Sequence, residues 1–198
     1  MNGTNQLVNV EDVQFSTGDR TLAVADTVFG APIERVFVRP IIVANSDGSN
    51  AADSLGSAEQ AAEIFERVDL IFAQSNVDIE FLDSVQYNNT FANVGDPNAA
   101  SRPLSDFNQI ISQGDAAGVG SSDARVVDLY FVRRNPGQSV ISGDGSGGFA
   151  SLNGLAFVGQ SGITIQVDEE FDFFSPTNII GRQFVATVVA HEIGHTLG

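Results

Sequence analysis

Residues 190–198 read Ala-His-Glu-Ile-Gly-His-Thr-Leu-Gly and contain the only two histidines of the 198-residue sequence. On a helix, positions four residues apart differ by about 40° around the axis and by one turn along it, so both imidazoles can reach one metal ion. Glu192 projects beside the pair, where a carboxylate can take a proton from a metal-bound water. The spacing predicts His191 and His195 as metal ligands and Glu192 as a general base. The alternative is a helix that carries two surface histidines by chance.

The residues before this stretch predict a helix packed on the core. Ile180, Phe184 and Val188 recur three or four positions apart, and the same series continues to His191 and His195. We therefore expect the histidines to extend a buried apolar face to the rim of the domain.

Upstream, apolar and β-branched runs alternate with helix-length connections. Ser57-Ala58-Glu59-Gln60 has the pattern of a capping box and begins a helix that reaches residue 74. Residues 86–122 are expected to be irregular, apart from a short helix near residues 106–113. Strands are expected at residues 35–44, 77–81, 125–133, 152–158 and 162–167. Pro40 lacks a backbone donor, which implies a bulge or an unpaired side within the first strand.

The connections decide how these strands pair. Long crossovers favour parallel neighbours, whereas the tight link between the last two strands makes them antiparallel. The sequence thus predicts an α/β fold with a mixed, mostly parallel five-stranded sheet, one antiparallel edge strand, a backing helix and the histidine-bearing helix. We expect residues 1–33 to be an N-terminal extension and residues 34–198 to be the domain.

The composition restricts the partners. The net charge is −16, from 25 acidic residues against nine basic ones, and all nine bases are arginine. This surface disfavours nucleic acid and anionic membranes, and it suits saline surroundings. There is no run of 18 apolar residues and no cysteine, so neither a membrane span nor a disulfide is expected. The first residues lack the pattern of a signal peptide, and we expect the chain to be a piece of a longer protein.

A glycine-rich segment at residues 135–148 raises the question of a second metal. Its single acid is Asp144, and no ladder of calcium ligands follows. A loop at the rim is the simpler interpretation, and a calcium (Ca2+) site is the alternative.

With Gly198 included, the motif reads His-Glu-x-x-His-x-x-Gly and resembles the signature of the metzincin clan of zinc peptidases, in reprolysin-like or matrixin-like form. In that clan the glycine forms a structural turn, and a third histidine follows three residues later. The resemblance implies that residues 34–198 are the N-terminal subdomain of a catalytic domain. It also implies that the C-terminal subdomain, with the third zinc (Zn2+) ligand and a Met-turn, is absent, since the single methionine is Met1.

The resemblance further implies a function. The parent protein is expected to be an extracellular zinc endopeptidase acting on protein or peptide substrates, with this length of chain inactive or weakly active. An edge strand containing Gly154, Leu155, Ala156 and Phe157 matches the substrate-binding strand of the clan. The alternative is a non-catalytic acidic secreted or surface domain with an inert motif. The sequence carries no signal for an oligomeric state.

Overall fold

The sheet is built around β1 (Glu34–Ala44), its longest strand, which pairs with three other strands. The computed structural model describes residues 34–53, 55–99, 101–123, 125–137, 154–158, 162–167, 177 and 179–198, all within the compact unit Glu34–Gly198. The other elements are α1 (Ala58–Ala73), β2 (Val77–Phe81), β3 (Val85–Asn88), α2 (Thr90–Val94), α3 (Asp106–Ala116), β4 (Val126–Val132), β5 (Gly154–Ala156), β6 (Gly162–Gln166) and α4 (Ile179–Leu197).

The strands form one mixed sheet in the order β2-β1-β4-β6-β5, and β3 also pairs with β1. Every pair is parallel except β5 with β6. The predicted α/β fold, mostly parallel with one antiparallel edge strand, is confirmed. The expected number of five strands is wrong, because the described residues hold six. The additional strand β3, like the short helix α2, lies in the segment expected to be irregular.

Pro40 lies where β1 changes partner. On one side β1 pairs with β2 as far as Val38 and with β3 from Ile41 onward. The carbonyl of Val38 accepts a hydrogen bond from the backbone of Leu82 on that side, at 2.8 Å. The backbone N–H and C=O groups of alternate residues in a strand point to the same neighbouring strand. The backbone nitrogen of Pro40 therefore points to the same side as the carbonyl of Val38, at the gap between β2 and β3. The predicted unpaired side is confirmed, and the missing donor of proline leaves no ladder bond unmade.

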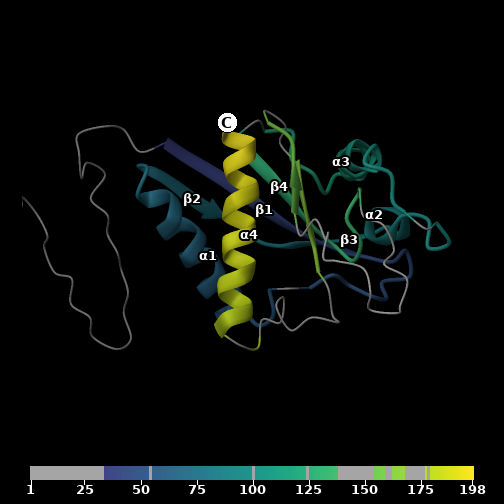
Figure 1. Cartoon of the computed structure of the whole chain (residues 1–198), viewed down its shortest axis with the longest axis horizontal. Coiled ribbons are helices and arrows are strands. Elements are labelled where there is room, and N and C mark those ends of the chain that lie inside the picture. The colour runs from purple at the N-terminus through teal and green to yellow at the C-terminus, as the bar shows by residue number, and fades with distance from the viewer. Residues whose placement is uncertain are drawn as a thin grey trace, which may run out of the picture. The chain divides into compact units, whose positions relative to one another are not determined.

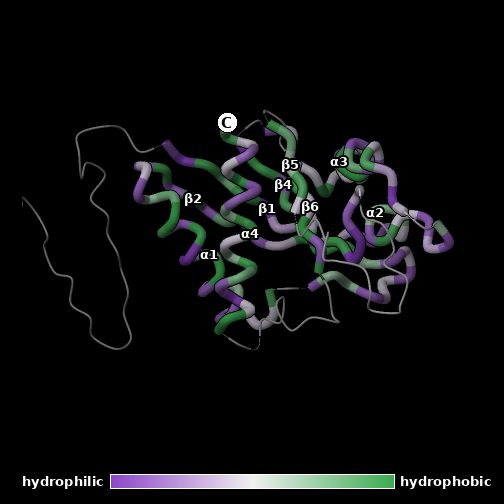
Figure 2. The backbone as a smooth tube through the Cα atoms, viewed as in Figure 1, coloured by the Kyte–Doolittle hydropathy of each residue, from purple (hydrophilic) through white to green (hydrophobic). Residues whose placement is uncertain are grey.

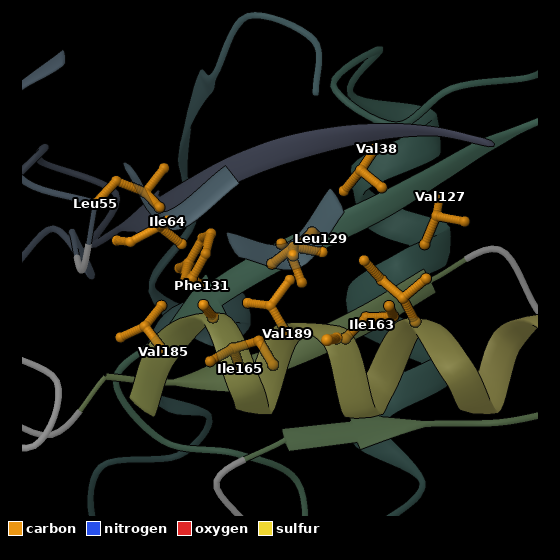
Figure 3. Packing of buried hydrophobic residues seen from close by; sticks show 14 of the residues in the cluster. Val38, Leu55, Ile64, Val127, Leu129, Phe131, Ile163, Ile165, Val185 and Val189 are labelled. Atoms are coloured by element: carbon orange, nitrogen blue, oxygen red, sulfur yellow. The ribbon is translucent and has the colours of Figure 1, made fainter. Parts of the chain in front are cut away.

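Helices cover both faces of the sheet. Figure 1 shows α1 and α4 side by side on one face, and these two helices share the larger hydrophobic core with the sheet. Figure 3 shows how this core packs, with the side chains of β4, β6 and α4 directed toward one another. Buried members of this core include Val38, Ile64, Leu129, Phe131, Ile163, Ile165, Val185 and Val189.

A smaller core lies on the opposite face. The side chains of β4 alternate, so that Leu129 and Phe131 join the larger core and Tyr130 and Val132 join this one. Its other buried members include residues of β1, α2 and α3. All seven residues of β4 are buried, as expected for a central strand covered on both faces.

The predicted start of α1 is confirmed. Ser57 is the N-cap, its side chain accepts from the backbone of Gln60 at 3.4 Å, and its backbone donates to the Gln60 side chain at 2.8 Å. Hydrophilic and hydrophobic residues alternate along α1 in Figure 2. This amphipathic pattern directs Ile64 and Val68 into the core.

Some expectations fall on residues outside those described. These are the N-terminal extension at residues 1–33, and Asp144 with the calcium alternative. Within the described part of the chain, no helix combines the length and the apolar character that crossing a membrane requires.

Candidate metal centre

The helix α4 carries all three residues of the predicted metal site. One side of this helix is anchored in the core by Val185, Val189 and Ile193, which are at most 1% exposed. The N-terminal half of α4 is tied to α1 by an ion pair between Arg182 and Glu63, with 2.6 Å between Nε and Oε2. The helix is therefore held both by apolar burial and by a charged contact, which fixes its side chains relative to the sheet.

The buried face of α4 is not the one that the sequence suggested. Ile180 is 66% exposed, and Phe184 and Val188 are half-buried, so the series leading to the histidines runs along the edge of the buried face. The expectation that the histidines continue a buried face is wrong. The histidines instead continue a polar series, four residues apart, that begins with Gln183 and Thr187, and all four of these residues are exposed.

His191 and His195 are both exposed and face each other. Their Nε2 atoms are 3.0 Å apart, and their ring centroids are 4.6 Å apart with the planes at 89°. Two nitrogen ligands on one tetrahedral zinc, each at about 2.0–2.1 Å, are separated by about 3.3 Å. The distance between the two imidazoles is within a few tenths of an ångström of that value, so the pair fits a single ion.

Glu192 differs from the histidines in being buried, with 7% of its surface exposed. Its side chain lies against Gly154 of β5. Burial raises the pKa of Glu192 above its usual value, and the nearby His191 and His195 act in the opposite direction. The site therefore combines two exposed nitrogen donors with one carboxylate shielded from solvent.

The strand β5 lies at the end of the sheet, with only β6 as its partner among the described strands. Gly154 and Ala156 face the α4 side, where Gly154 meets Glu192 and Ala156 packs on the larger core. The ring of Phe157 packs edge-to-face on Phe107 of α3, with centroids 4.9 Å apart. The side chains of these residues therefore do not all meet at the histidines. What they share is a backbone edge, and their role in substrate binding stays a prediction.

Gly198, directly after α4, has a φ of +97°, a backbone conformation that favours glycine. The described residues contain no group of three or more histidine, cysteine, aspartate or glutamate side chains placed to hold a metal. The structure places the two predicted ligands side by side, with the predicted base next to His191 on the same helix. The third histidine that the resemblance implies would follow Gly198 by three residues, and it stays a prediction.

Sequence reasoning missed the contact between Gly154 and Glu192. A glycine within a strand pattern is a known signal of close backbone approach, and Gly154 carried that signal. The partner could not be named from the sequence, because β5 and α4 meet only through the tertiary fold.

Residues 58–198 match the sequence profile of the family described as Metallo-peptidase family M12B Reprolysin-like. No curated protein matches the chain significantly. Among solved structures, the chain is similar at 18% identity to part of one titled "Structure of a chaperone-substrate complex", with a TM-score of 0.41. That alignment covers 85% of this chain, and the chain spans 27% of the length of the other. The segment matched by the profile contains both histidines, Glu192 and β5.

Proposed function

The chain belongs to the reprolysin-like M12B family of metallopeptidases, and on this premise we propose that it provides part of the active site of a zinc-dependent endopeptidase. In this proposal His191 and His195 hold the zinc and Glu192 is the general base. The observation that carries it is the placement of two imidazole nitrogens 3.0 Å apart on the same helix as a buried carboxylate.

The two imidazoles are suited to a catalytic zinc. Catalytic zinc sites use three protein ligands and leave one position open for water or substrate. The described residues supply two of these ligands, and we propose that a third comes from outside them. When bound, zinc lowers the pKa of a coordinated water and polarises a carbonyl group.

Glu192 supplies the proton chemistry. Its carboxylate accepts a proton as water attacks the peptide carbonyl, and it returns that proton to the leaving amine. Burial raises its pKa, which brings the protonated form closer in free energy to the ionised one and suits a group that must take up and release a proton.

The strand β5 is the proposed binding site for the substrate backbone. Its outer edge offers backbone donors and acceptors to an extended peptide, which would add a strand to the sheet. Gly154, Leu155, Ala156 and Phe157 provide this edge through their backbone groups. Because antiparallel pairing with β6 holds β5 in register, the edge is formed before substrate arrives.

The proposal is tested by replacing Glu192 with glutamine in a zinc-loaded protein that contains this chain together with the proposed third ligand. We expect hydrolysis of a fluorogenic peptide mixture to fall by about 10²–10⁴-fold, the usual contribution of a general base, with zinc content unchanged. Glu80→Gln, an exposed residue of β2, is the matched control and should keep full activity. Unchanged hydrolysis in Glu192→Gln would refute the role of Glu192. Absence of both zinc and hydrolysis in that protein before any substitution would favour an inert, non-catalytic domain.

A further inference from the structure

The backbone of β5 approaches Glu192 so closely that residue 154 has no room for a side chain. A Cβ atom added to Gly154 would lie 2.4 Å from both Cγ and Oε1 of Glu192 and 2.6 Å from its Cδ. Real Cβ contacts essentially never fall below 3.0 Å. The Glu192 side chain therefore occupies the space that any other residue at position 154 would fill.

This restriction is steric and not conformational. Gly154 is absent from the described glycines with positive φ, so an alanine could adopt its backbone angles. A larger residue is excluded at position 154 because β5 and α4 lie so close together. Gly154 is paired with Ile165 in the antiparallel ladder, and α4 is anchored by its buried residues. Of the groups in contact, only the Glu192 carboxylate can move without disturbing the sheet or the helix.

We propose that Gly154 is a positioning residue, whose missing side chain sets the location of the Glu192 carboxylate beside the two imidazoles. This rests on the proposed function for its catalytic consequence, although the geometric consequence stands without it. The role differs from substrate binding. Binding uses the backbone edge of β5, whereas positioning uses the face of Gly154 that meets α4.

The two roles predict different kinetics. A methyl group at position 154 displaces the carboxylate and leaves the backbone edge in place. We therefore expect Gly154→Ala to lower kcat by at least about 10-fold, a fraction of the usual contribution of a general base, with KM changed less than about threefold. Zinc content should not change, because His191 and His195 are exposed and the three atoms nearest to a Cβ at Gly154 all belong to Glu192.

Gly162→Ala is the matched control. A Cβ atom at Gly162 would also lie 2.4 Å from its nearest neighbour, but that neighbour is Cδ1 of Ile111 in α3. Both variants introduce one methyl group into the same β5–β6 region, and only one of them meets Glu192. We expect Gly162→Ala to lower the melting temperature while its kcat and KM, per folded molecule, stay unchanged. Equal losses of kcat in the two variants would overturn the proposal.

A second measurement is independent of activity. In metal-free protein labelled with ¹³C at glutamate carboxyl groups, the Glu192 signal is identified by its loss in Glu192→Gln. Gly154→Ala should shift that signal, and Gly162→Ala should leave it in place. A shifted signal, with no hydrolysis even when the proposed third ligand is present, would support positioning and refute the proposed function. An unshifted signal with full kcat would refute positioning alone. If Gly154→Ala does not fold, the double variant with Glu192→Ala must fold, since the obstructing side chain is gone. A double variant that stays unfolded would overturn the proposal.

Discussion

Glu192 and the two histidines share one helix and differ in exposure. His191 and His195 face the solvent, whereas Glu192 is turned toward β5 and buried. An exposed imidazole pair can accept a metal ion without rearrangement of the core. A shielded carboxylate keeps its position because the neighbouring backbone confines it. The division of roles proposed for these residues follows from this difference.

Arg102 is a buried charged residue outside the metal centre, and its hydrogen bonds stabilise the fold. Only 2% of its surface is exposed, and its guanidinium donates to the backbone carbonyls of Ala92, Phe91 and Arg134 and to the carboxylate of Asp106. Burial lowers its pKa to about 10, so it stays charged at neutral pH. It joins α2, the residues after β4 and the start of α3.

We predict that Arg102→Lys destabilises the protein by about 3 kcal/mol, because a single ammonium cannot serve the acceptors that the planar guanidinium reaches and leaves some of them unpaired. Urea denaturation measures this loss. Arg125→Lys is the control, since Arg125 forms an exposed ion pair with Asp123 and its replacement should leave the midpoint unchanged. Equal midpoints for Arg102→Lys and the unmodified protein would contradict the assigned role.

For single residues, the sequence predicted the relative placement of side chains that lie on the same helix. The spacing of the two histidines and of Glu192 is a property of one helix, so the sequence predicted that they would lie together. The contacts of Glu192 with Gly154 and of Arg102 with three carbonyls join residues from different elements. No local pattern specifies such contacts, and only the tertiary fold revealed them.

Among the elements, α1 and α3 begin differently. The N-cap of α1, Ser57, exchanges hydrogen bonds with Gln60, whereas Ser105 before α3 has no side-chain capping bond. We predict that Ser57→Ala lowers the free energy of unfolding by about 1 kcal/mol, the usual contribution of an N-cap. Ser105→Ala should change it by much less. Thermal unfolding of both variants measures these changes. An equal decrease in the free energy of unfolding would show that the Ser57 cap stabilises the protein no more than Ser105 does.

The elements also show where sequence patterns stop being sufficient. β2 and α1 have clear periodicity and were predicted correctly. β3 has four residues, and only Tyr87 among them is buried, so its pattern was too short to recognise. It is a strand because β1 continues past the end of β2 and offers an open edge there. That cause lies in the length of another strand and not in the sequence of β3.

For the molecule as a whole, the two faces of the sheet bury different groups. The face under α1 and α4 is apolar, whereas the face under α3 buries polar atoms of Asp128, Tyr130 and Thr164. Asp128 accepts a hydrogen bond from the backbone of Ser121 at 2.8 Å through Oδ2, and its Oδ1 has no partner among the described residues. Burial raises the pKa of Asp128 to about 6, and this is opposed by the Ser121 bond and by Arg39 and reinforced by Asp115.

This carboxyl makes stability depend on pH. Its folded-state pKa lies above the unfolded value near 3.9, so its favourable contribution is complete below that value and is lost as the pH rises through about 6. Asp128→Asn removes the titration. We predict that the free energy of unfolding of the variant, relative to that of the unmodified protein, rises by about 1 kcal/mol from pH 5 to pH 7.5. Urea denaturation at a series of pH values measures this change.

Asp123→Asn is the control for the sign of this effect. Hydrogen bonds from Arg125 lower the pKa of Asp123 to about 2, so its contribution is present above pH 4 and is lost only on further acidification. Its effect should therefore be constant between pH 5 and 7.5. If the difference in free energy of unfolding between Asp128→Asn and the unmodified protein stayed constant over this range, Asp128 would not be the source of the pH dependence.

The central claim is that His191 and His195 together hold zinc, and X-ray absorption at the zinc edge of the zinc-loaded protein tests it most directly. The account predicts at least two imidazole nitrogens at about 2.0–2.1 Å, one of which is lost in His195→Ala. A zinc environment of oxygen ligands alone, unchanged in His191→Ala and His195→Ala, would contradict the claim.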